Sequence, residues 1–354
     1  PEGNLNVGPI SAGAAPGPMC YPLGGKEPTI TDANLVLGRL PSKLIGGEIS
    51  LSVERSRQGI NNLAQQLGVD MTTEQLASGI IEIANWNQAN KIRQITIQRG
   101  IDPRTLALLS FGGSGPAQSP LVMDILDMNT CVIPPNPGNL SAFGLLAVDW
   151  RTDHIITKVM VEKMIDPKEV TDIYSKLERE AQEMLTRDGL DISTHRYVRE
   201  ADIRYFGQST EVRVAAPDND FDQDSVNELI EAFHLAHERI FGYAYRNEQK
   251  VEVVNFCLAG FGVIDRPILP QLKSKNGDTN SVPIETRQVY FDEKHIETPI
   301  FDRTQLLAEQ IIIGPSIIEE FGSTTVIFPG QEATIDDKGI IVIHRKNTLC
   351  CQSS

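Results

Sequence analysis

The sequence has few cysteines for its length and no long apolar run. Its 354 residues include five cysteines, and none of them forms a C-x-x-C pair or another metal-binding spacing. An odd, scattered number of cysteines in a large acidic chain is typical of a reduced, cytoplasmic protein. The longest strongly apolar stretches fall well short of the roughly 20 residues that a spanning helix needs, so no association with a membrane is expected.

Basic residues are also in short supply relative to acidic ones. Lysine and arginine total 32 and aspartate and glutamate total 47, which gives a net charge of −15. Such a chain is not expected to bind nucleic acid or an anionic membrane surface non-specifically. Hydrophobic residues make up 40% and charged residues 22%, as in a globular protein, and the length predicts two or three domains.

The chain opens on Pro1 rather than on methionine, and its first segment is dense in glycine and proline. Residues 8–25 read GPISAGAAPGPMCYPLGG. An N-terminus is often poorly ordered, whereas this segment already has the glycines and prolines that are typical of structured turns. We expect the chain to be the C-terminal part of a longer protein.

The sharpest local pattern is a glycine-rich turn between a short apolar strand and a helix. Residues 106–111 (LALLSF) lead into Gly112-Gly113-Ser114-Gly115-Pro116, and a helix is expected from about residue 116 to 127. This geometry lets backbone N–H groups approach a phosphate or nucleotide, because glycine has no side chain in the way. A second strand at 130–133 completes a parallel strand–helix–strand unit. The turn matches neither G-x-G-x-x-G nor a P-loop, so alone it does not distinguish a ligand site from an ordinary turn.

Two helices are expected before this turn, at about residues 50–67 and 73–99. The middle of the second helix contains Asn85, Asn87, Gln88 and Asn90 within one and a half turns. Amides are unfavourable when buried without partners, so they either face solvent or form a polar face toward a ligand or another domain.

The pattern of charged and apolar residues changes after Arg151. A charged helix is expected at about 167–187, an alternating strand near 196–214, a helix at about 222–241 and a further strand from 251. His234 and His237 lie three residues apart on the later helix, so a metal site must be weighed. His237 falls on the apolar side and no third ligand is near in sequence, which favours buried packing histidines. Residues 266–285 then predict a linker, and short strands follow it.

Six segments, in this order, resemble the hydantoinase A/oxoprolinase family over nearly the whole chain. They are GPISAGAAPGPMCYPLGGKEPTITDANLVLGRL, RGIDPRTLALLSFGGSGPAQ, PPNPGNLSAFGLLAVDWR, DIRYFGQSTEVRV, FHLAHERIFGY and GPSIIEEFGSTTVIFPG. The resemblance implies an α/β chain whose residues 1–152 are the second lobe of an actin-like (ribonuclease H-like) ATPase fold. An α+β region at 153–265 and a β-rich C-terminal module at 266–354 would follow.

The same resemblance implies ATP-dependent hydrolysis of a cyclic amide, such as a hydantoin, an N-methylhydantoin or 5-oxoproline. ATP would phosphorylate the amide oxygen, which makes the carbon open to attack by water. Related subunits serve in ATP-dependent ketone carboxylases, and this half of the chain does not separate the two reactions. Members work with a hydantoinase B-like subunit or region. A third possibility is that the isolated chain is a non-catalytic assembly module.

The sequence departs from the family in lacking the glycine-rich phosphate motif of the DVGGTFTD kind and a second phosphate loop. It therefore resembles the C-terminal part of such a subunit, whose missing N-terminal part would be a partner. FGGSGPAQ is similar to the turn that contacts adenosine in actin-like ATPases, so Gly112, Gly113, Ser114 and Gly115 are the candidate nucleotide contacts. ATP with Mg²⁺ is expected to bind in the full-length protein, and the chain alone is expected to be inactive because phosphoryl transfer needs the phosphates and metal positioned. The metal ligands are not predicted.

Asp32 is the candidate catalytic residue, although the sequence leaves its role open. It follows Thr31 in a polar turn, where a carboxylate could orient Mg–ATP or substrate, or could cap the following helix. Cys20 and Tyr21 receive no role, because the sequence shows no base for a nucleophilic cysteine. Valine at Gly113 is predicted to weaken ATP binding while leaving the fold intact.

Overall fold

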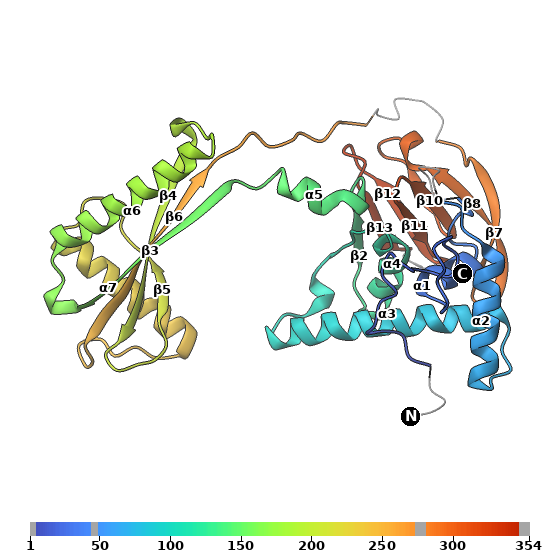
Figure 1. Cartoon of the computed structure of the whole chain (residues 1–354), viewed down its shortest axis with the longest axis horizontal. Coiled ribbons are helices and arrows are strands. Elements are labelled where there is room, and N and C mark those ends of the chain that lie inside the picture. Colours follow the sequence, from blue (N-terminus) through green and yellow to red (C-terminus); the bar gives the residue numbers. More distant parts are fainter. Residues whose placement is uncertain (1–4, 44–48, 273–280, 347–354) are drawn as a thin grey trace, which may run out of the picture. The chain divides into compact units, whose positions relative to one another are not determined.

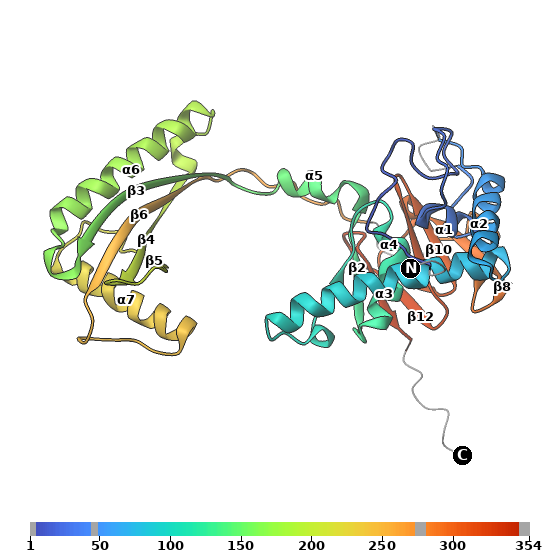
Figure 2. The ribbon, with the colours of Figure 1, turned by 60° about the horizontal axis from the view of Figure 1, so that its bottom comes forward.

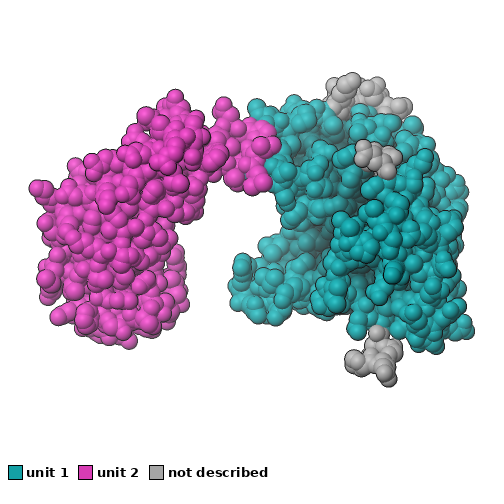
Figure 3. All heavy atoms as spheres, viewed as in Figure 1, with its two compact units in different colours: residues 1–144, 268–354 teal, residues 145–267 magenta. Residues whose placement is uncertain are grey.

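The computed structural model describes residues 5–43, 49–272 and 281–346 of the chain. Within these residues the protein is a mixed α/β protein with three sheets, and it divides into two compact units (Figure 3). Unit 1 comprises residues 1–144 and 268–354, and unit 2 comprises residues 145–267. Across the described ranges, no helix is both long and apolar enough to cross a membrane.

The first three helices of unit 1 begin at side chains that cap them. The hydroxyl groups of Thr29, Ser52 and Thr72 each accept a hydrogen bond from a backbone N–H of the first helical turn, which has no partner within the helix. The predicted helices near 50–67 and 73–99 are confirmed. The helices are α1 (Ile30–Val36), α2 (Val53–Leu67), α3 (Thr73–Gln98), α4 (Gly115–Ile125) and α5 (Leu140–Leu145).

In the described part of unit 1, strands that are far apart in the sequence share a five-stranded sheet (Figure 1). In spatial order they are β1 (Leu108–Leu109), β2 (Thr130–Ile133), β13 (Ile341–Arg345), β12 (Gln331–Ile335) and β9 (Ile311–Ile313). β1 and β2 are parallel and α4 connects them, which confirms the predicted strand–helix–strand unit. β13 pairs with β2 in antiparallel fashion.

A second sheet of unit 1 is built from the strands between residues 285 and 327. Its order is β11 (Ser323–Ile327), β10 (Ser316–Glu320), β8 (Lys294–Asp302) and β7 (Glu285–Phe291). α4 packs against both sheets: Ala117 is buried with Phe291 of the second sheet, and Met123 is buried with Cys131 of the first. The glycine-rich turn before α4 is therefore held by the packing of both sheets.

Unit 2 is an antiparallel sheet with two helices packed on the same face (Figure 2). Tyr174 of the first helix contacts Phe256 of the sheet, and Phe233 of the second contacts Tyr205. The predicted helices at about 167–187 and 222–241 and the strand from 251 are confirmed, whereas the alternating run near 196–214, predicted as one strand, forms two antiparallel strands joined by a turn. The elements are β3 (Trp150–Val161), α6 (Pro167–Arg187), β4 (His195–Tyr205), β5 (Val212–Ala215), α7 (Gln223–Phe241) and β6 (Val251–Gly262).

The units divide the chain differently from the three parts expected from sequence. The middle part, 153–265, lies within unit 2, but residues 1–152 and 266–354 do not form separate units. The physical reason is the pairing of β13 with β2, which places C-terminal strands in the sheet that includes β1. Local apolar patterns do not report which distant strands pair. Part of the predicted linker, residues 273–280, lies outside the described residues.

Candidate functional site

A cavity of about 260 Å³ in unit 1 brings together three segments that are far apart in the sequence. The first segment runs from Tyr21 through α1 to Pro41. The second is the glycine-rich turn with the start of α4, and the third runs from the end of β10 to the start of β11. Each corresponds to part of a segment singled out in the sequence. The lining residues are Tyr21, Ile30, Thr31, Asn34, Leu40, Pro41, Gly113, Ser114, Ala117, Gln118, Glu319, Glu320, Gly322, Ser323 and Thr324.

The glycine-rich turn is packed tightly against the β10–β11 turn. A Cβ atom on Gly113 would lie 3.0 Å from the backbone oxygen of Gly322, and the Ser323 hydroxyl donates to the Gly113 carbonyl at 3.1 Å. Gly112 has a φ of +86°, which a side chain would make unfavourable. Gly113 lines the cavity, whereas Gly112 and Gly115 support the turn from outside its lining.

Ser114 is the N-cap residue of α4 and makes no capping hydrogen bond with its side chain. Its hydroxyl group is therefore not used by the helix, and the residue is exposed and lines the cavity. At the start of α4, a helix of 11 residues, Gly115 and Ala117 have backbone N–H groups, whereas Pro116 has none. Such N–H groups lack partners within the helix and carry a partial positive charge, so this end of the cavity offers hydrogen-bond donors.

Asp32 is fully buried and lies in the first turn of α1 rather than at its N-cap. Its carboxylate accepts hydrogen bonds from Met19 N (3.0 Å), Cys20 N (2.7 Å), Thr29 N (2.8 Å), Thr29 Oγ1 (2.8 Å) and Ser56 Oγ (2.6 Å). With Thr29 it forms a reciprocal capping box. These contacts give Asp32 a capping role, and its predicted catalytic role stays a prediction.

The hydrogen bonds also determine the ionisation of Asp32 and its neighbour. Burial alone would raise the pKa of Asp32, but the hydrogen bonds from Ser56 and Thr29 bring it below the usual value. Burial and the adjacent carboxylate raise the pKa of the Cys20 thiol to about 12. Cys20 is thus a neutral thiol at physiological pH, which agrees with assigning it no nucleophilic role.

Glu319 and Glu320, which end β10, were not singled out from the sequence. Glu320 is satisfied: Oε1 accepts from Arg303 Nη1 at 2.6 Å and Oε2 accepts from Asn136 N at 3.1 Å. Glu319 Oε1 accepts from Arg287 Nη2 at 2.9 Å. Burial raises the pKa of both carboxyl groups, although the arginines oppose this effect. The only sequence signal was their place in the segment GPSIIEEFGSTT, because partners as distant as Arg287 are not visible in a local pattern.

The amide-rich part of α3 reaches the cavity indirectly. Gln88 Nε2 donates to Gln118 Oε1 at 2.8 Å, and Gln118 lines the cavity. Asn85 is buried, and neither polar atom of its side chain has a hydrogen-bond partner. Asn87 instead donates to the Val7 carbonyl at the surface. Part of this stretch therefore forms a polar face that contacts the cavity wall, and part faces solvent.

His234 and His237 are buried among aromatic side chains of unit 2. The Tyr205 hydroxyl is hydrogen-bonded to His234 Nδ1 at 2.8 Å, and His237 Nδ1 donates to the Tyr243 carbonyl at 2.9 Å. Among the described residues, no group of three or more histidine, cysteine, aspartate or glutamate side chains could hold a metal ion. The packing interpretation of the two histidines is confirmed, and each has a hydrogen-bond partner.

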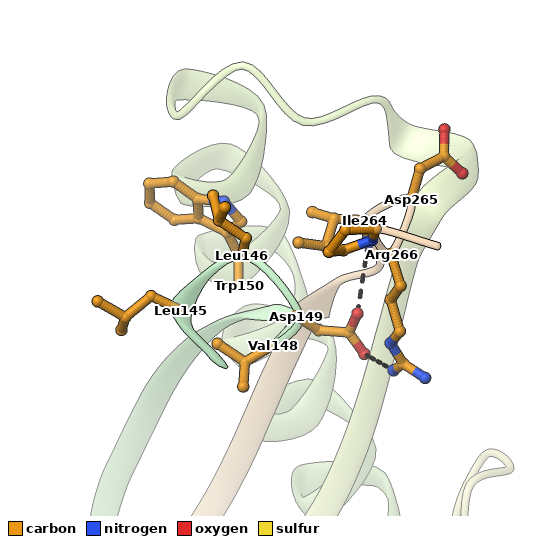
Figure 4. Close-up of a pocket in the computed structure, with 9 residues that line it drawn as sticks. Leu145, Leu146, Val148, Asp149, Trp150, Ile264, Asp265 and Arg266 are labelled. Atoms are coloured by element: carbon orange, nitrogen blue, oxygen red, sulfur yellow. Dashed lines mark hydrogen bonds and ion pairs between the residues drawn. The ribbon is translucent and has the colours of Figure 1, made fainter. Parts of the chain in front are cut away.

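Unit 2 also has a cavity of about 600 Å³, lined by the residues at the start of β3 and after β6 (Figure 4). Leu145, Leu146 and Trp150 make much of this lining apolar. Its Asp149 carboxylate already accepts from Ile264 N and pairs with Arg266, both at 3.3 Å. The smaller cavity of unit 1 is the better candidate site, because polar groups from three segments converge on it.

Two family models match this chain. The hydantoinase/oxoprolinase model matches residues 1–154, and the hydantoinase/oxoprolinase C-terminal domain model matches residues 160–347. The second model alone covers more than half of the chain.

Curated relatives match over almost all of this chain. An uncharacterized protein of Methanocaldococcus jannaschii is 36% identical over 97% of this chain and 48% of its own length. The caprolactamase subunit alpha of Pseudomonas jessenii is 33% identical over 94% of this chain and 49% of its own. The acetophenone carboxylase gamma subunit of Aromatoleum aromaticum is 29% identical over 96% and 48%. The chain thus spans about half the length of each of these three relatives.

Solved structures also resemble the chain. The ATP-dependent caprolactamase of Pseudomonas jessenii superposes with a TM-score of 0.74 at 31% identity, over 97% of this chain and 51% of that one. A nucleotide-free acetone carboxylase superposes with a TM-score of 0.86 at 22% identity, over 97% and 50%. At 22% identity, the similarity to the acetone carboxylase shows a shared fold.

Proposed function

Because the chain belongs to the hydantoinase/oxoprolinase family, we propose that it is part of an ATP-dependent subunit that opens a cyclic amide. The observation that carries the proposal is the cavity at which three of the family-like segments meet. These segments could resemble the family only because they pack in the same way. The convergence of their polar residues on one cavity instead supports ligand binding. The candidate substrates are a hydantoin, an N-methylhydantoin, 5-oxoproline or a lactam such as caprolactam.

We also propose that residues 1–152 correspond to the second lobe of an actin-like (ribonuclease H-like) ATPase fold. The parallel pair β1–β2, the connecting α4 and the glycine-rich turn between β1 and α4 support this assignment. The antiparallel strands β13, β12 and β9 extend the same sheet with residues from the C-terminal region.

The lining of the cavity suits the nucleoside part of ATP rather than its phosphates. The described residues that line it include Glu319 and Glu320 but no lysine or arginine. Ser114 and the start of α4 supply donors, and Gly113 lines the cavity beside them. The triphosphate and Mg²⁺ would be held by residues outside this chain, so the chain alone is not expected to hydrolyse ATP.

In the complete enzyme, bound ATP would supply the phosphoryl group that activates the amide oxygen toward attack by water. The part played by this chain is to bind and orient the nucleoside. Asp32 contributes by positioning, because its hydrogen bonds join the loop at Met19 and Cys20 to α1, whose Thr31 and Asn34 line the cavity. A hydantoinase B-like polypeptide is the proposed partner, and two relatives are themselves named as subunits.

A second candidate function is that of an ATP-dependent carboxylase subunit. The observation in its favour is the 29% identity with the acetophenone carboxylase gamma subunit over 96% of this chain. Both reactions use ATP to activate a carbonyl oxygen, so the same nucleoside cavity would serve either one.

The experiment is a screen of ATP hydrolysis by the complex of this chain with its N-terminal half and the hydantoinase B-like partner. Release of ADP should rise on addition of one of the four cyclic amides and yield the ring-opened acid. Stimulation only by a ketone together with bicarbonate would favour the carboxylase instead. Turnover of ATP by the 354-residue chain alone would contradict the proposal that the phosphates are bound elsewhere.

A further inference from the structure

We propose that Asn34 and Glu319 form a pair of hydrogen-bond acceptors that holds a nucleoside through its N–H or O–H groups. Both residues line the cavity of unit 1, and they come from α1 and β10. This acceptor pair would determine which nucleosides fit and which end of a nucleotide enters. The inference rests on the proposed nucleotide-binding function.

Asn34 provides the first acceptor. The residue is 2% exposed, and Nδ2 donates to the Ile30 carbonyl at 3.2 Å. This bond fixes the orientation of the amide, because the opposite orientation would place two oxygens together. Oδ1 is buried and has no hydrogen-bond partner. A buried acceptor without a partner is unfavourable, and a ligand that donates to it removes that penalty on binding.

Glu319 provides the second acceptor. The residue is 5% exposed, and Oε1 accepts from Arg287 Nη2. Among the described residues, no group donates to Oε2. Arg287 also pairs with Glu285 at 2.5 Å, so one positive charge is shared between two carboxylates. The neighbouring Glu320 differs, because both of its oxygens have donors.

The charge around the cavity indicates which part of a ligand fits. When both carboxyl groups are ionised, Glu285, Arg287 and Glu319 together carry one net negative charge, and the described residues that line the cavity include no lysine or arginine. A phosphate or carboxylate at this wall would be repelled. A neutral group with N–H or O–H bonds would instead satisfy both acceptors. Adenosine offers two such sources, the amino group of its base and its ribose hydroxyls.

The test uses the full 354-residue chain and two variants, Asn34→Ala and Glu319→Gln. Binding of adenosine is measured by isothermal titration calorimetry, or by NMR titration where affinity is in the millimolar range. Loss of one hydrogen bond should weaken binding about 3- to 10-fold in each variant. Glu297→Gln is the matched control: it removes an exposed carboxylate from β8 of the same sheet, and because Glu297 neither pairs with Arg287 nor lines the cavity, the affinity of this variant should match the wild type.

Analogues of adenosine identify the group that each acceptor contacts. Inosine replaces the amino group by an oxygen, and 2′-deoxyadenosine and 3′-deoxyadenosine each lack one hydroxyl. Where an analogue lacks the group that Asn34 contacts, Asn34→Ala should no longer weaken binding further. The same comparison applies to Glu319→Gln, and non-additive losses of this kind identify a direct contact.

The outcomes separate this inference from the proposed function. Adenosine affinity unchanged in both variants, with the complete enzyme still hydrolysing ATP, would overturn the acceptor pair and leave the function standing. Absence of nucleoside binding by the wild-type chain together with a complex that does not use ATP would overturn both. Circular dichroism checks folding, and Asn34→Ala keeps the test decisive if Glu319→Gln fails to fold, because it removes an acceptor that the unliganded protein leaves unsatisfied.

Discussion

Asp32 makes more hydrogen bonds than any single role predicted for it requires. Five donors from the loop before α1, from Thr29 and from α2 share its two oxygens. The carboxylate therefore connects the loop at Met19 and Cys20, the start of α1, which lines the cavity, and helix α2. A residue of this kind affects activity through the shape of the site, and its effect on stability should be as large as its effect on turnover.

Asp32→Asn should lower the free energy of unfolding of unit 1 by on the order of 3 kcal/mol, because an amide NH₂ group would face buried N–H and O–H donors. Urea unfolding followed by circular dichroism measures the change. Glu82→Gln, an exposed position in the middle of α3, is the control and should stay within about 0.5 kcal/mol of the wild type. A variant that keeps its stability and loses turnover would point to the catalytic role instead.

His234 should make the stability of unit 2 depend on pH. Burial lowers its pKa below the usual 6.5, so the folded protein keeps the ring neutral where the unfolded chain binds a proton. The free energy of unfolding should therefore fall as the pH drops below about 6.5. Urea unfolding at pH 7.5 and pH 5.5 measures this loss, which should be smaller in His234→Gln. Equal losses in the two proteins would show that other groups are responsible.

Single residues of the site were predictable only where a local pattern marks them. Gly113 and Ser114 stand in a glycine-rich turn before a helix, and both line the cavity. Glu319 was missed because its environment depends on Arg287, which lies 32 positions away and is brought near by strand pairing. The unsatisfied oxygen of Asn34 was missed for a similar reason, since only the packed structure shows which polar atoms are left without partners.

At the scale of elements, the close contact between the two turns changes the expectation for Gly113. The Cβ atom of a valine there would already lie 3.0 Å from the backbone oxygen of Gly322, and its two methyl groups need further room, so the β10–β11 turn would have to move. Gly113→Val should thus lower the free energy of unfolding by about 1–3 kcal/mol, as overpacking does.

Ser114→Ala should change the free energy of unfolding by no more than about 0.5 kcal/mol, because the hydroxyl group does not cap the helix. The same variant should weaken nucleoside binding. Thermal unfolding and calorimetric titration measure these effects in both variants.

Arg303 joins the two sheets of unit 1. It pairs with Glu320 of β10 at 2.6 Å and donates to the carbonyls of Ile133 on β2 (3.0 Å) and Gly339 (2.8 Å). Arg303→Met should lower the free energy of unfolding by about 3–5 kcal/mol, because the buried Glu320 carboxylate loses its positive partner and both carbonyls lose this donor. Arg151→Met removes an exposed pair with Asp153 and should cost no more than about 1 kcal/mol. Similar losses in the two variants, measured by urea unfolding, would contradict this account.

The elements themselves were largely predictable, because their signals are local. Apolar spacing and capping residues located α3 and α6 to within a residue or two, and strict alternation located β4. The pairing of β13 with β2 was not predictable, since about 210 residues separate positions such as Ile133 and Ile341. The C-terminal strands were predicted to form a separate module because strands that are close in sequence usually pair with each other.

At the scale of the whole molecule, the two units should unfold independently. The buried cluster of unit 2 is drawn from residues 160–258, and the other clusters are drawn from unit 1. Residues 145–267 expressed alone should therefore fold, with a dispersed NMR spectrum and a cooperative thermal transition. In the whole chain, Arg303→Met should shift the unfolding transition of unit 1, and His234→Gln should shift that of unit 2. A single transition shifted by both variants would show that the units are energetically coupled.

The pairing of β13 with β2 has a consequence for the order of events during protein synthesis. The ribosome completes residues 145–267 while β2 still lacks its neighbour, so unit 2 can fold first. Until residue 345 has emerged, the growing chain carries an open strand edge on β2 and the apolar side of α4 without its cover. Chaperone binding to the nascent protein should therefore be strongest between the translation of β2 and that of β13.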